Sequence, residues 1–360
     1  MYNWQNPEWP EFQYDASEFA KHEREFLKKA GQIDGKFMYF TKQQSELTLV
    51  DLLVSEAIKS SAIEGEMISR TDLSSSIKRH LGFDTPQFFI KDKRSAGFAK
   101  LLVSSRESFE SPLSESMLFE WHTLLMQGQY INNVGAWRSH TEPMRVISGS
   151  IGKEIVHFEA PPSSQVQKEM NRFFDWFSQA NLQSILIKAA IAHLYFESIH
   201  PFEDGNGRIG RLISEKALSM GLGKPVMFSI STIIEKKRNE YYEALKNAQQ
   251  SLKIGDWVLW FCEMVIEAQD AFDDIVSFSI KKAKFFEKNN ANFNLRQNKA
   301  IAKMLEKGEF FEGGMSAKKY VSITRCSLAT ATRDLVELAE KGILAINGNG
   351  RSRNYQIIFD

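Results

Sequence analysis

The sequence has little cysteine, no net charge and no long apolar run. Its 360 residues include two cysteines, Cys262 and Cys326, which are too few for a disulfide framework or a four-thiolate zinc site. So little cysteine favours a reducing cytoplasm as the compartment. Lys plus Arg number 45 and Asp plus Glu number 45, so the formal net charge is zero. This balance argues against a whole-chain nucleic-acid coat or a polybasic membrane binder.

Signals that direct a chain to a membrane are also missing. The apolar run at 257–262, the longest of the C-terminal half, is far shorter than the roughly 20 residues that a spanning helix needs. The first residues have neither the charged region nor the apolar core of a signal peptide. We therefore expect a soluble, cytoplasmic protein with no membrane partner.

The sequence does contain ample material for a folded core. Apolar residues make up 43% of the chain, and 27 Phe and 7 Trp rule out disorder over most of it. The aromatic-rich segment 1–40 predicts an arm packed on the main body. Beyond it, apolar residues at helical spacing predict helices at 45–61, 69–80, 93–106, 113–127, 164–178, 183–198, from 206 onward, 231–250 and 256–287.

One segment breaks the helical pattern. Short β-prone runs at 144–149 and 153–158, followed by Pro161 and Pro162, predict a β-hairpin. The main body is therefore expected to be mainly α, with one hairpin.

A second, smaller domain is expected after the polar break at 289–292. Three helices followed by two strands around a glycine-rich turn are the layout of a winged helix-turn-helix domain. The predicted helices are 295–307, 315–322 and 327–341, and the predicted strands are 343–346 and 353–359.

The most informative stretch is 200–211, His-Pro-Phe-Glu-Asp-Gly-Asn-Gly-Arg-Ile-Gly-Arg. The glycines around Asn206 allow successive backbone N–H groups to converge on one anion. They also lie where a new helix begins, and the positive end of a helix dipole favours phosphate. Arg208 and Arg211 project from one face of that helix toward the same anion.

Two further side chains of this stretch suit chemistry on a bound polyphosphate. Asp204 is placed to hold a divalent cation that shares oxygen ligands with phosphates. His200 can exchange a proton near neutral pH. A glycine-rich turn with a helix cap and a core histidine is the alternative, but so many compatible positions in one short stretch favour a phosphate site.

This stretch resembles, at every fixed position, the signature of the Fic family, His-x-Phe-x-(Asp/Glu)-Gly-Asn-Gly-Arg-x-x-Arg. Fic proteins are helical and mostly transfer AMP from ATP to a hydroxyl side chain of a target protein. The resemblance implies His200 as general base, Asp204 as magnesium ligand, Gly205, Asn206 and Gly207 as the α-phosphate cradle, and Arg208 and Arg211 as grips on the β- and γ-phosphates.

The same resemblance implies ATP as substrate and Mg²⁺ as cofactor. The acceptor would be a Ser, Thr or Tyr hydroxyl of a target protein or of the chain itself, and a homodimer is compatible with it. The expected domains are an N-terminal arm with the inhibitory helix region at 1–110, a Fic catalytic core at 111–288 and a winged helix-turn-helix at 289–360.

The predicted hairpin resembles the flap of Fic proteins, which pairs with a target segment by strand addition. The segment Gly135-Ala-Trp-Arg138 precedes it, as expected for a flap. The tip, 148–153, matches no recognisable pattern. The flap residues expected to lie near the target are Val146, Ile147, Ile155 and Val156.

Tyr241 and Tyr242 resemble the start of the helix whose first tyrosine lies near the adenine in Fic proteins. The resemblance adds Tyr241 to the ATP-binding residues. Ordinary core or surface aromatics are the alternative for this pair.

Ser60-Ser-Ala-Ile-Glu64-Gly65 resembles the inhibitory motif of the family, (Ser/Thr)-x-x-x-Glu-(Gly/Asn). By spacing alone it would be a helix end with a glycine cap. Beside the signature, it implies that Glu64 pairs with Arg211 and occupies the γ-phosphate position, so that ATP binds unproductively or not at all. Glu64 would thus lie in the ATP site and act as a brake from within the chain. Family context leaves open a part for this glutamate in removing AMP.

The C-terminal segment 291–360 carries 11 Lys plus Arg and 7 Asp plus Glu, a local excess of four positive charges. Residues 327–335 resemble the recognition helix of winged-helix domains, and Arg351 and Arg353 lie on the expected wing. Acidic residues on the same helix argue against DNA: Asp334, Glu337 and Glu340. Contact with DNA and contact with protein, including dimerisation, both stay open.

Three hypotheses follow for the function. The first is a self-inhibited protein AMP-transferase. The second is a DNA-binding regulator in which the Fic body senses a nucleotide, and the third is a Fic enzyme with another reaction, such as removal of AMP. The intact His200 and both arginines favour the first.

Overall fold

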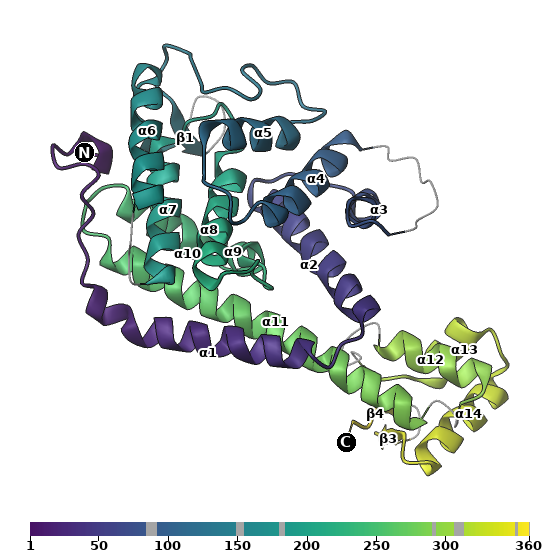
Figure 1. Cartoon of the computed structure of the whole chain (residues 1–360). Helices are drawn as coiled ribbons and strands as arrows, with labels where there is room; N and C mark the ends of the chain where they lie inside the picture. The colour runs from purple at the N-terminus through teal and green to yellow at the C-terminus, as the bar shows by residue number, and fades with distance from the viewer. Residues whose placement is uncertain are drawn as a thin grey trace. The chain divides into compact units, whose positions relative to one another are not determined.

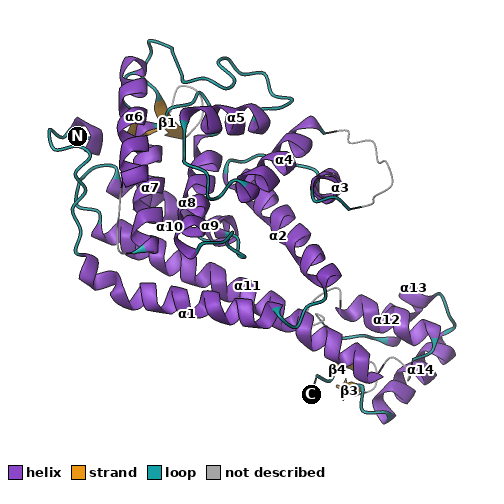
Figure 2. Cartoon of the chain, viewed as in Figure 1, coloured by secondary structure: helices purple, strands orange, loops and turns teal. Residues whose placement is uncertain are grey.

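The computed structural model describes residues 1–83, 92–148, 155–179, 184–289, 293–305, 313–349 and 352–359 (Figure 1). The chain forms two compact units, one made of residues 1–35 and 41–272 and the other of residues 36–40 and 273–360. The described residues are mostly helical, which confirms the predicted fold class, and they include two short two-stranded sheets (Figure 2). No helix among them is both long and apolar enough to cross a bilayer.

The first unit is built of helices and one hairpin. In chain order its elements are η1 (Asn3–Gln5), η2 (Ala16–Phe19), α1 (Ala20–Phe37), α2 (Lys42–Ile63), α3 (Arg70–His80), α4 (Lys93–Glu107), α5 (Glu115–Leu125), β1 (Arg145–Ser148), β2 (Ile155–Glu159), α6 (Ser163–Gln179), α7 (Ile185–Ile199), α8 (Asn206–Leu222), α9 (Ile230–Lys236), α10 (Arg238–Ala248) and α11 (Gly255–Asn289). The part of α11 beyond Phe272 belongs to the second unit, so the units divide inside this helix, before the predicted boundary at 288–289.

Helix α7 forms the centre of the first unit. Ser184 caps its start by accepting a hydrogen bond from the backbone N–H of Ile187 (3.2 Å). The helix is mostly apolar and buried along nearly its whole length, and it packs against α6 and α8 (Figure 1). This packing fixes the point at which the chain leaves α7, at His200.

The aromatic N-terminal arm packs on the first unit, as predicted. The indole N–H of Trp9 donates to Glu169 Oε2 (2.8 Å), and that of Trp4 donates to the backbone oxygen of Glu159 (2.7 Å). Paired in this way, the buried indole of Trp9 keeps its hydrogen bond while its ring contributes to the core, and the half-buried Trp4 fixes the start of the arm.

The prediction of an arm through residue 40 was incomplete, because residues 20–37 form the helix α1. Its buried residues Phe26, Ala30 and Ile33 repeat at helical spacing, a signal present in the sequence. The helix expected at 231–250 is likewise two helices, α9 and α10, which meet at Lys237.

The hairpin β1–β2 is antiparallel, with Arg145 opposite Glu159 and Val146 opposite Phe158. The register shifts between Val146 and Ile147, which marks a bulge. Ile147 then lies opposite Val156, and Ser148 opposite Ile155. The tip beyond Ser148, at 149–154, lies outside the described residues.

The second unit contains α12 (Leu295–Leu305), α13 (Ala317–Thr324), α14 (Leu328–Glu340), β3 (Leu344–Asn347) and β4 (Asn354–Ile357). These are the helices and strands that the sequence predicts for this segment, in the predicted order. That they form a winged helix stays a prediction. Arg351 and the linker residues 290–292 lie outside the described residues.

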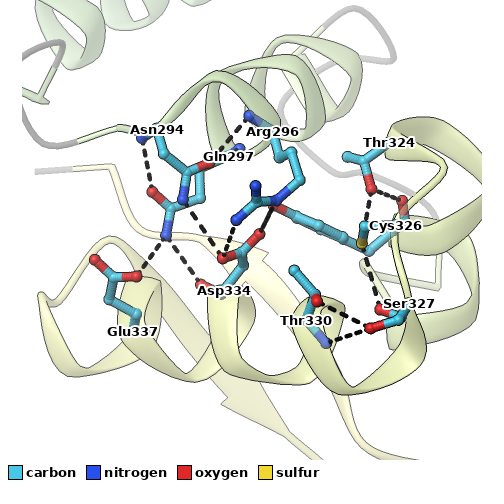
Figure 3. A network of polar contacts seen from close by, with 10 residues as sticks. Asn294, Arg296, Gln297, Thr324, Cys326, Ser327, Thr330, Asp334 and Glu337 are labelled. Carbon is cyan, nitrogen blue, oxygen red and sulfur yellow. Dashed lines mark hydrogen bonds and ion pairs between the residues drawn. The ribbon is translucent and has the colours of Figure 1, made fainter.

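A buried carboxylate ties the helices of this unit together (Figure 3). Asp334 of α14 is 3% exposed and accepts hydrogen bonds from Arg296 Nε (2.9 Å) and Arg296 Nη2 (3.2 Å) of α12. The hydroxyl of Tyr320 on α13 also donates to it (2.9 Å). Asp334 is therefore a neutralised internal charge and does not belong to the exposed face of α14.

Candidate active site

Helix α7 ends at His200, whose backbone is left-handed, with φ of 51°. A residue other than glycine rarely adopts this conformation and needs support from its surroundings. Arg138 gives that support: its guanidinium donates to the backbone oxygens of His200 (2.8 Å), Ile199 (3.3 Å) and Pro161 (2.5 Å). Because the last carbonyls of a helix lack partners within it, Arg138 closes the end of α7 and holds His200 in place.

Two buried polar side chains shape the glycine-rich loop before α8. Asn206 donates its amide to the backbone oxygen of Phe202 and accepts from the backbone N–H of the same residue (both 2.9 Å). His122 Nδ1 accepts from the N–H of Gly135 (2.9 Å), so its proton lies on Nε2, which donates to the backbone oxygen of Asp204 (3.2 Å). The side chain of Asn206 is thus used within the loop and fixes the loop at the start of α8.

The two signature arginines lie buried on α8, and each contacts a carboxylate from the turn after α2. Arg211 Nη2 donates to Glu64 Oε1 (2.8 Å) and to the backbone oxygen of Ser60 (2.9 Å), and its Nε donates to Ser60 Oγ (3.0 Å). Arg208 Nη1 donates to Glu66 Oε2 (2.7 Å). The arginines are 2% (Arg208) and 1% (Arg211) exposed, so the guanidinium side of each ion pair is shielded from water, whereas the carboxylates are partly exposed.

The turn after α2 is fixed by glycine. Gly65 has φ of 78°, a conformation that glycine adopts without strain. The N–H of Glu66 then returns to the backbone oxygen of Ser61 (2.9 Å). A Cβ at Gly207, in the first turn of α8, would overlap the carboxylate of Glu64. Glycine at both positions therefore lets Glu64 reach the start of α8.

Helix α2 is held to α9 by charged contacts away from the arginines. Lys59 pairs with Glu235 (3.0 Å), and the buried Glu56 accepts from Ser229 Oγ (2.6 Å) and from the hydroxyl of Ser231. These contacts set the position from which α2 delivers Glu64.

A cavity of about 660 Å³ lies beside His200 and the first turn of α8. This volume is within the range of roughly 300–1,000 Å³ that is usual for small-molecule sites. Its lining comes from the end of α2, from the hairpin, from the loop before α8 and from α10: Ile63, Glu64, Met144, Arg145, Val146, His157, Phe158, Glu197, His200, Glu203, Asp204, Gly205, Asn206, Gly207, Arg238, Asn239, Tyr241, Tyr242, Leu245, Lys246 and Gln249.

His200 and Glu197 form a buried pair at the inner end of this cavity, with His200 Nδ1 at 3.7 Å from Glu197 Oε2. Burial, strengthened by the positive charge of Arg138, lowers the pKa of His200 to about 4. Burial, strengthened by the negative charge of Glu64, raises the pKa of Glu197 to about 8. At neutral pH the histidine is therefore an unprotonated base beside an uncharged carboxyl group.

The two tyrosines of α10 have different surroundings. Tyr241 is 2% exposed, and its hydroxyl lies 2.8 Å from Nε2 of the buried His193. Tyr242 is 37% exposed, and its hydroxyl donates to the backbone oxygen of Ile63 (3.3 Å), the last residue of α2. The contact with His193 thus fixes the ring of Tyr241 in the wall of the cavity, whereas the hydrogen bond of Tyr242 connects α10 to the end of α2.

Residues 112–218, which include this loop and both arginines, match the model of the Fic/DOC family. The chain is a Fic family protein. Residues 2–83 match a second model, a domain of unknown function (DUF4172). The segment 60–65, which resembles the inhibitory motif of the family, lies within this second match.

Curated relatives of this Fic protein are named as adenylyltransferases. A probable protein adenylyltransferase of Aquifex aeolicus (strain VF5) is 30% identical over 93 residues, which are 26% of this chain and 27% of that protein. The protein adenylyltransferase Fic of Nematostella vectensis is 30% identical over 112 residues, 30% of this chain and 25% of that protein. The chain therefore spans about a quarter of the length of these two curated relatives.

Solved structures share the fold over more of the chain. A Fic family protein from Desulfovibrio desulfuricans G20 covers 97% of this chain and 98% of its own, with a TM-score of 0.55 and 19% identity. A Fic domain containing signaling protein from Bacteroides thetaiotaomicron VPI-5482 covers 73% of this chain and 98% of its own, with a TM-score of 0.52 and 18% identity. At these identities the likeness concerns the fold alone.

The residues that the Fic signature marks lie together in the first unit. His200, Asp204, Gly205, Asn206 and Gly207 line the cavity together with Glu64 and Tyr241, and Arg208 and Arg211 are buried on the same helix as Gly207. Of the flap residues, Val146 lines the cavity and Val156 is 42% exposed. Ile147 and Ile155 are placed by their backbone pairing alone.

Three contributors to this Fic site were missed in the sequence: Arg138, Glu197 and Glu66. The sequence places Arg138 in the segment before the predicted flap, but its contacts with the end of α7 depend on the fold. Glu197 precedes the signature, and in the sequence it is one polar residue on a mostly apolar predicted helix.

Among the described residues, no group of three or more His, Cys, Asp or Glu side chains gathers as a metal site.

The buried histidines of this site are expected to stay neutral into the acid range. Burial lowers the pKa of His122 to about 4 and that of His193 to about 3, as it lowers that of His200 to about 4. The fold binds the neutral rings, so their contribution to stability is present above about pH 6.5 and is lost as the pH falls toward 4. A pH titration of the ring NMR signals from pH 8 to 4 checks this, with the unfolded chain in urea as reference. A His200 signal, assigned with the His200→Ala variant, that titrates near pH 6.5 in the folded chain would contradict it.

Proposed function

We propose that this Fic protein is an AMP-transferase that moves AMP from ATP to a hydroxyl side chain of a target protein and of its own chain, with Glu64 as its brake. The observation that carries the proposal is that His200 and the first turn of α8 line one nucleotide-sized cavity, beside two buried arginines. An unprotonated base, a helix N-terminus and paired guanidinium groups are the parts that transfer of a phosphate-linked group requires.

His200 is the base of the proposed reaction. With Nδ1 toward Glu197, Nε2 is left to take the proton of the attacking hydroxyl. The hydroxyl oxygen forms a bond to the α-phosphorus, the bond from that phosphorus to the β-phosphate oxygen breaks, and pyrophosphate leaves. Its low pKa keeps His200 ready to accept a proton at neutral pH, although it also makes the ring a weaker base.

The phosphates of ATP would lie at the start of α8. The backbone N–H groups of 205–207 would hold the α-phosphate, and Arg208 and Arg211 would hold the β- and γ-phosphates. The adenine would lie toward Tyr241 of α10, on the opposite side of the cavity.

Asp204 suits a magnesium ion. Its side chain is 50% exposed at the cavity, and the phosphates of ATP would supply further oxygen ligands, as is usual for Mg²⁺. The ion, when bound, neutralises charge on the phosphates. Asp204 is the residue of this chain that would hold it.

The hairpin supports a role as a flap for the target. In the described residues β1 and β2 pair with each other in a sheet of two strands. A strand at a sheet edge presents backbone groups to which an extended segment can add. A target segment bound in this way would bring its hydroxyl toward the cavity that Val146 and Phe158 line.

Mass spectrometry of peptides tests the proposed reaction. After the Glu64→Gly variant is incubated with ATP and Mg²⁺, peptides from the chain should carry AMP on Ser, Thr or Tyr. Peptides that carry phosphate instead, or no adduct, would contradict AMP transfer.

DNA binding by the second unit is a second candidate function, because the carboxylate of Asp334 is buried and paired with Arg296. The exposed side of α14 then presents Ser327, Thr332 and Arg333 without that negative charge. Such side chains suit phosphate and base contacts.

Replacing Arg333 with alanine should therefore weaken retardation of duplex DNA by the full chain and lower the salt dependence of binding by about one ion. Lys21→Ala removes the same charge from an exposed position of α1 and is the matched control. No retardation of any duplex at low salt would favour the protein-contact alternative.

A further inference from the structure

The turn after α2 delivers two carboxylates to the signature arginines, and the inhibitory motif accounts for one of them. Glu64 lies within the motif and contacts Arg211, whereas Glu66 follows the motif and contacts Arg208 at 2.7 Å. Both carboxylates flank the reversal at Gly65 and are therefore placed by the same turn.

The guanidinium of Arg208 has few hydrogen-bond partners besides Glu66. It is 2% exposed, and within the described residues its Nε and Nη2 have no hydrogen-bond partner. The carboxylate of Asp204 is farther away, at 3.5 Å from Nη2. A buried guanidinium with unpaired donors favours an additional anion, because unsatisfied buried donors are costly. Its one hydrogen bond within the described residues goes to Glu66.

Glu66 is better able to leave its arginine than a fully buried group. Its side chain is 24% exposed, so water can solvate the carboxylate when the pair opens. Arg208 cannot move out in the same way, because its helix is packed against the centre of the unit. An incoming phosphate would therefore displace the carboxylate of Glu66 and take its place as the partner of Arg208.

We infer that Glu66 is a second brake, which competes with the β-phosphate of a nucleotide for Arg208 while Glu64 competes with the γ-phosphate for Arg211. The inference rests on the proposed nucleotide site. It implies that the two carboxylates have different effects on nucleotide affinity. Glu66 weakens the binding of ADP and ATP alike, and Glu64 weakens the binding of ATP alone.

Calorimetric titration with ATP and with ADP, in the presence of Mg²⁺, separates the two carboxylates. The full chain with His200→Ala serves as the background, so that ATP is not consumed. Glu66→Gln keeps the size of the side chain and removes its charge. It should lower Kd for ATP and for ADP by the same factor of about ten, since a charged hydrogen bond is removed from competition. Glu64→Gln should lower Kd for ATP and leave that for ADP unchanged.

Glu235→Gln is the matched control. Glu235 holds α2 through Lys59 and contacts neither arginine, so its loss loosens the same helix without freeing Arg208 or Arg211. Its Kd values should stay at those of the background.

The outcomes distinguish the inference from the proposed site. Suppose that Glu64→Gln tightens the binding of ATP, but that Glu66→Gln changes neither Kd or tightens the binding of ATP alone. Glu66 is then no brake on the β-phosphate, and the inference fails while the proposed site stands. If Glu235→Gln tightens both nucleotides as Glu66→Gln does, general loosening of α2 explains the effect and the inference fails. If no variant binds either nucleotide, the proposed site fails and the inference fails with it.

Discussion

Replacing Glu64 with glycine should raise the incorporation of AMP into the chain by about a hundredfold or more. In the structure Glu64 contacts Arg211 at 2.8 Å and fills the space above Gly207. Removing the carboxylate frees Arg211 for the γ-phosphate and lets the α-phosphate align with the attacking hydroxyl. Orientation of this kind contributes several kcal/mol, and each 1.36 kcal/mol is about tenfold in rate. The measurement is label incorporated from ATP over time by the variant and the wild type.

Arg211→Ala is the informative control for this prediction. It breaks the same ion pair but also removes the grip on the γ-phosphate, so it should not activate. If Glu64 did no more than end α2, Glu64→Gly would shift the melting temperature slightly and leave incorporation unchanged. Equal incorporation by wild type and Glu64→Gly would therefore contradict the brake.

Replacing His200 with alanine in the Glu64→Gly chain should lower AMP incorporation by about 10²–10⁴-fold, the usual cost of losing a general base. His200 is the one imidazole of the signature, and Asp204 is the side chain proposed to hold the magnesium ion. Binding of ATP should persist, because Arg208, Arg211 and the loop are held by contacts that do not involve the imidazole. Incorporation and ATP affinity are measured on the same preparation.

His80→Ala provides the comparison for the loss of an imidazole. His80 is the exposed last residue of α3 and is not among the residues that line the cavity. It should leave incorporation near the level of the Glu64→Gly chain. Undiminished incorporation by the His200→Ala variant would exclude His200 as the base.

Much of the site could be predicted from the sequence because its parts are contiguous. The run 200–211 specifies a loop and a helix start by local chemistry alone, and the loop from Phe202 to Asn206 closes through hydrogen bonds between neighbours. The helices of both units followed from apolar spacing. The exceptions are α1, whose apolar spacing at Phe26, Ala30 and Ile33 follows an aromatic arm, and the helix expected at 231–250, which is divided at Lys237.

The rest depends on contacts between distant segments. Arg208 and Glu66 are 142 residues apart in the sequence, and Arg138 lies 62 residues before His200. No local sequence pattern predicts such a pair, because each residue alone resembles an ordinary charged surface residue. The raised pKa of Glu197 likewise comes from burial, a property of the packed unit that the neighbours of Glu197 in the sequence do not reveal.

The most direct test of the central claim is the fate of two labels in the Glu64→Gly chain. ATP labelled at the α-phosphate and ATP labelled at the γ-phosphate are supplied in parallel, and the protein is separated from free nucleotide. AMP transfer predicts that the α-label enters the protein, that the γ-label leaves in pyrophosphate, and that His200→Ala abolishes the α-signal. Label from the γ-phosphate in the protein, or no label from either, would contradict the account.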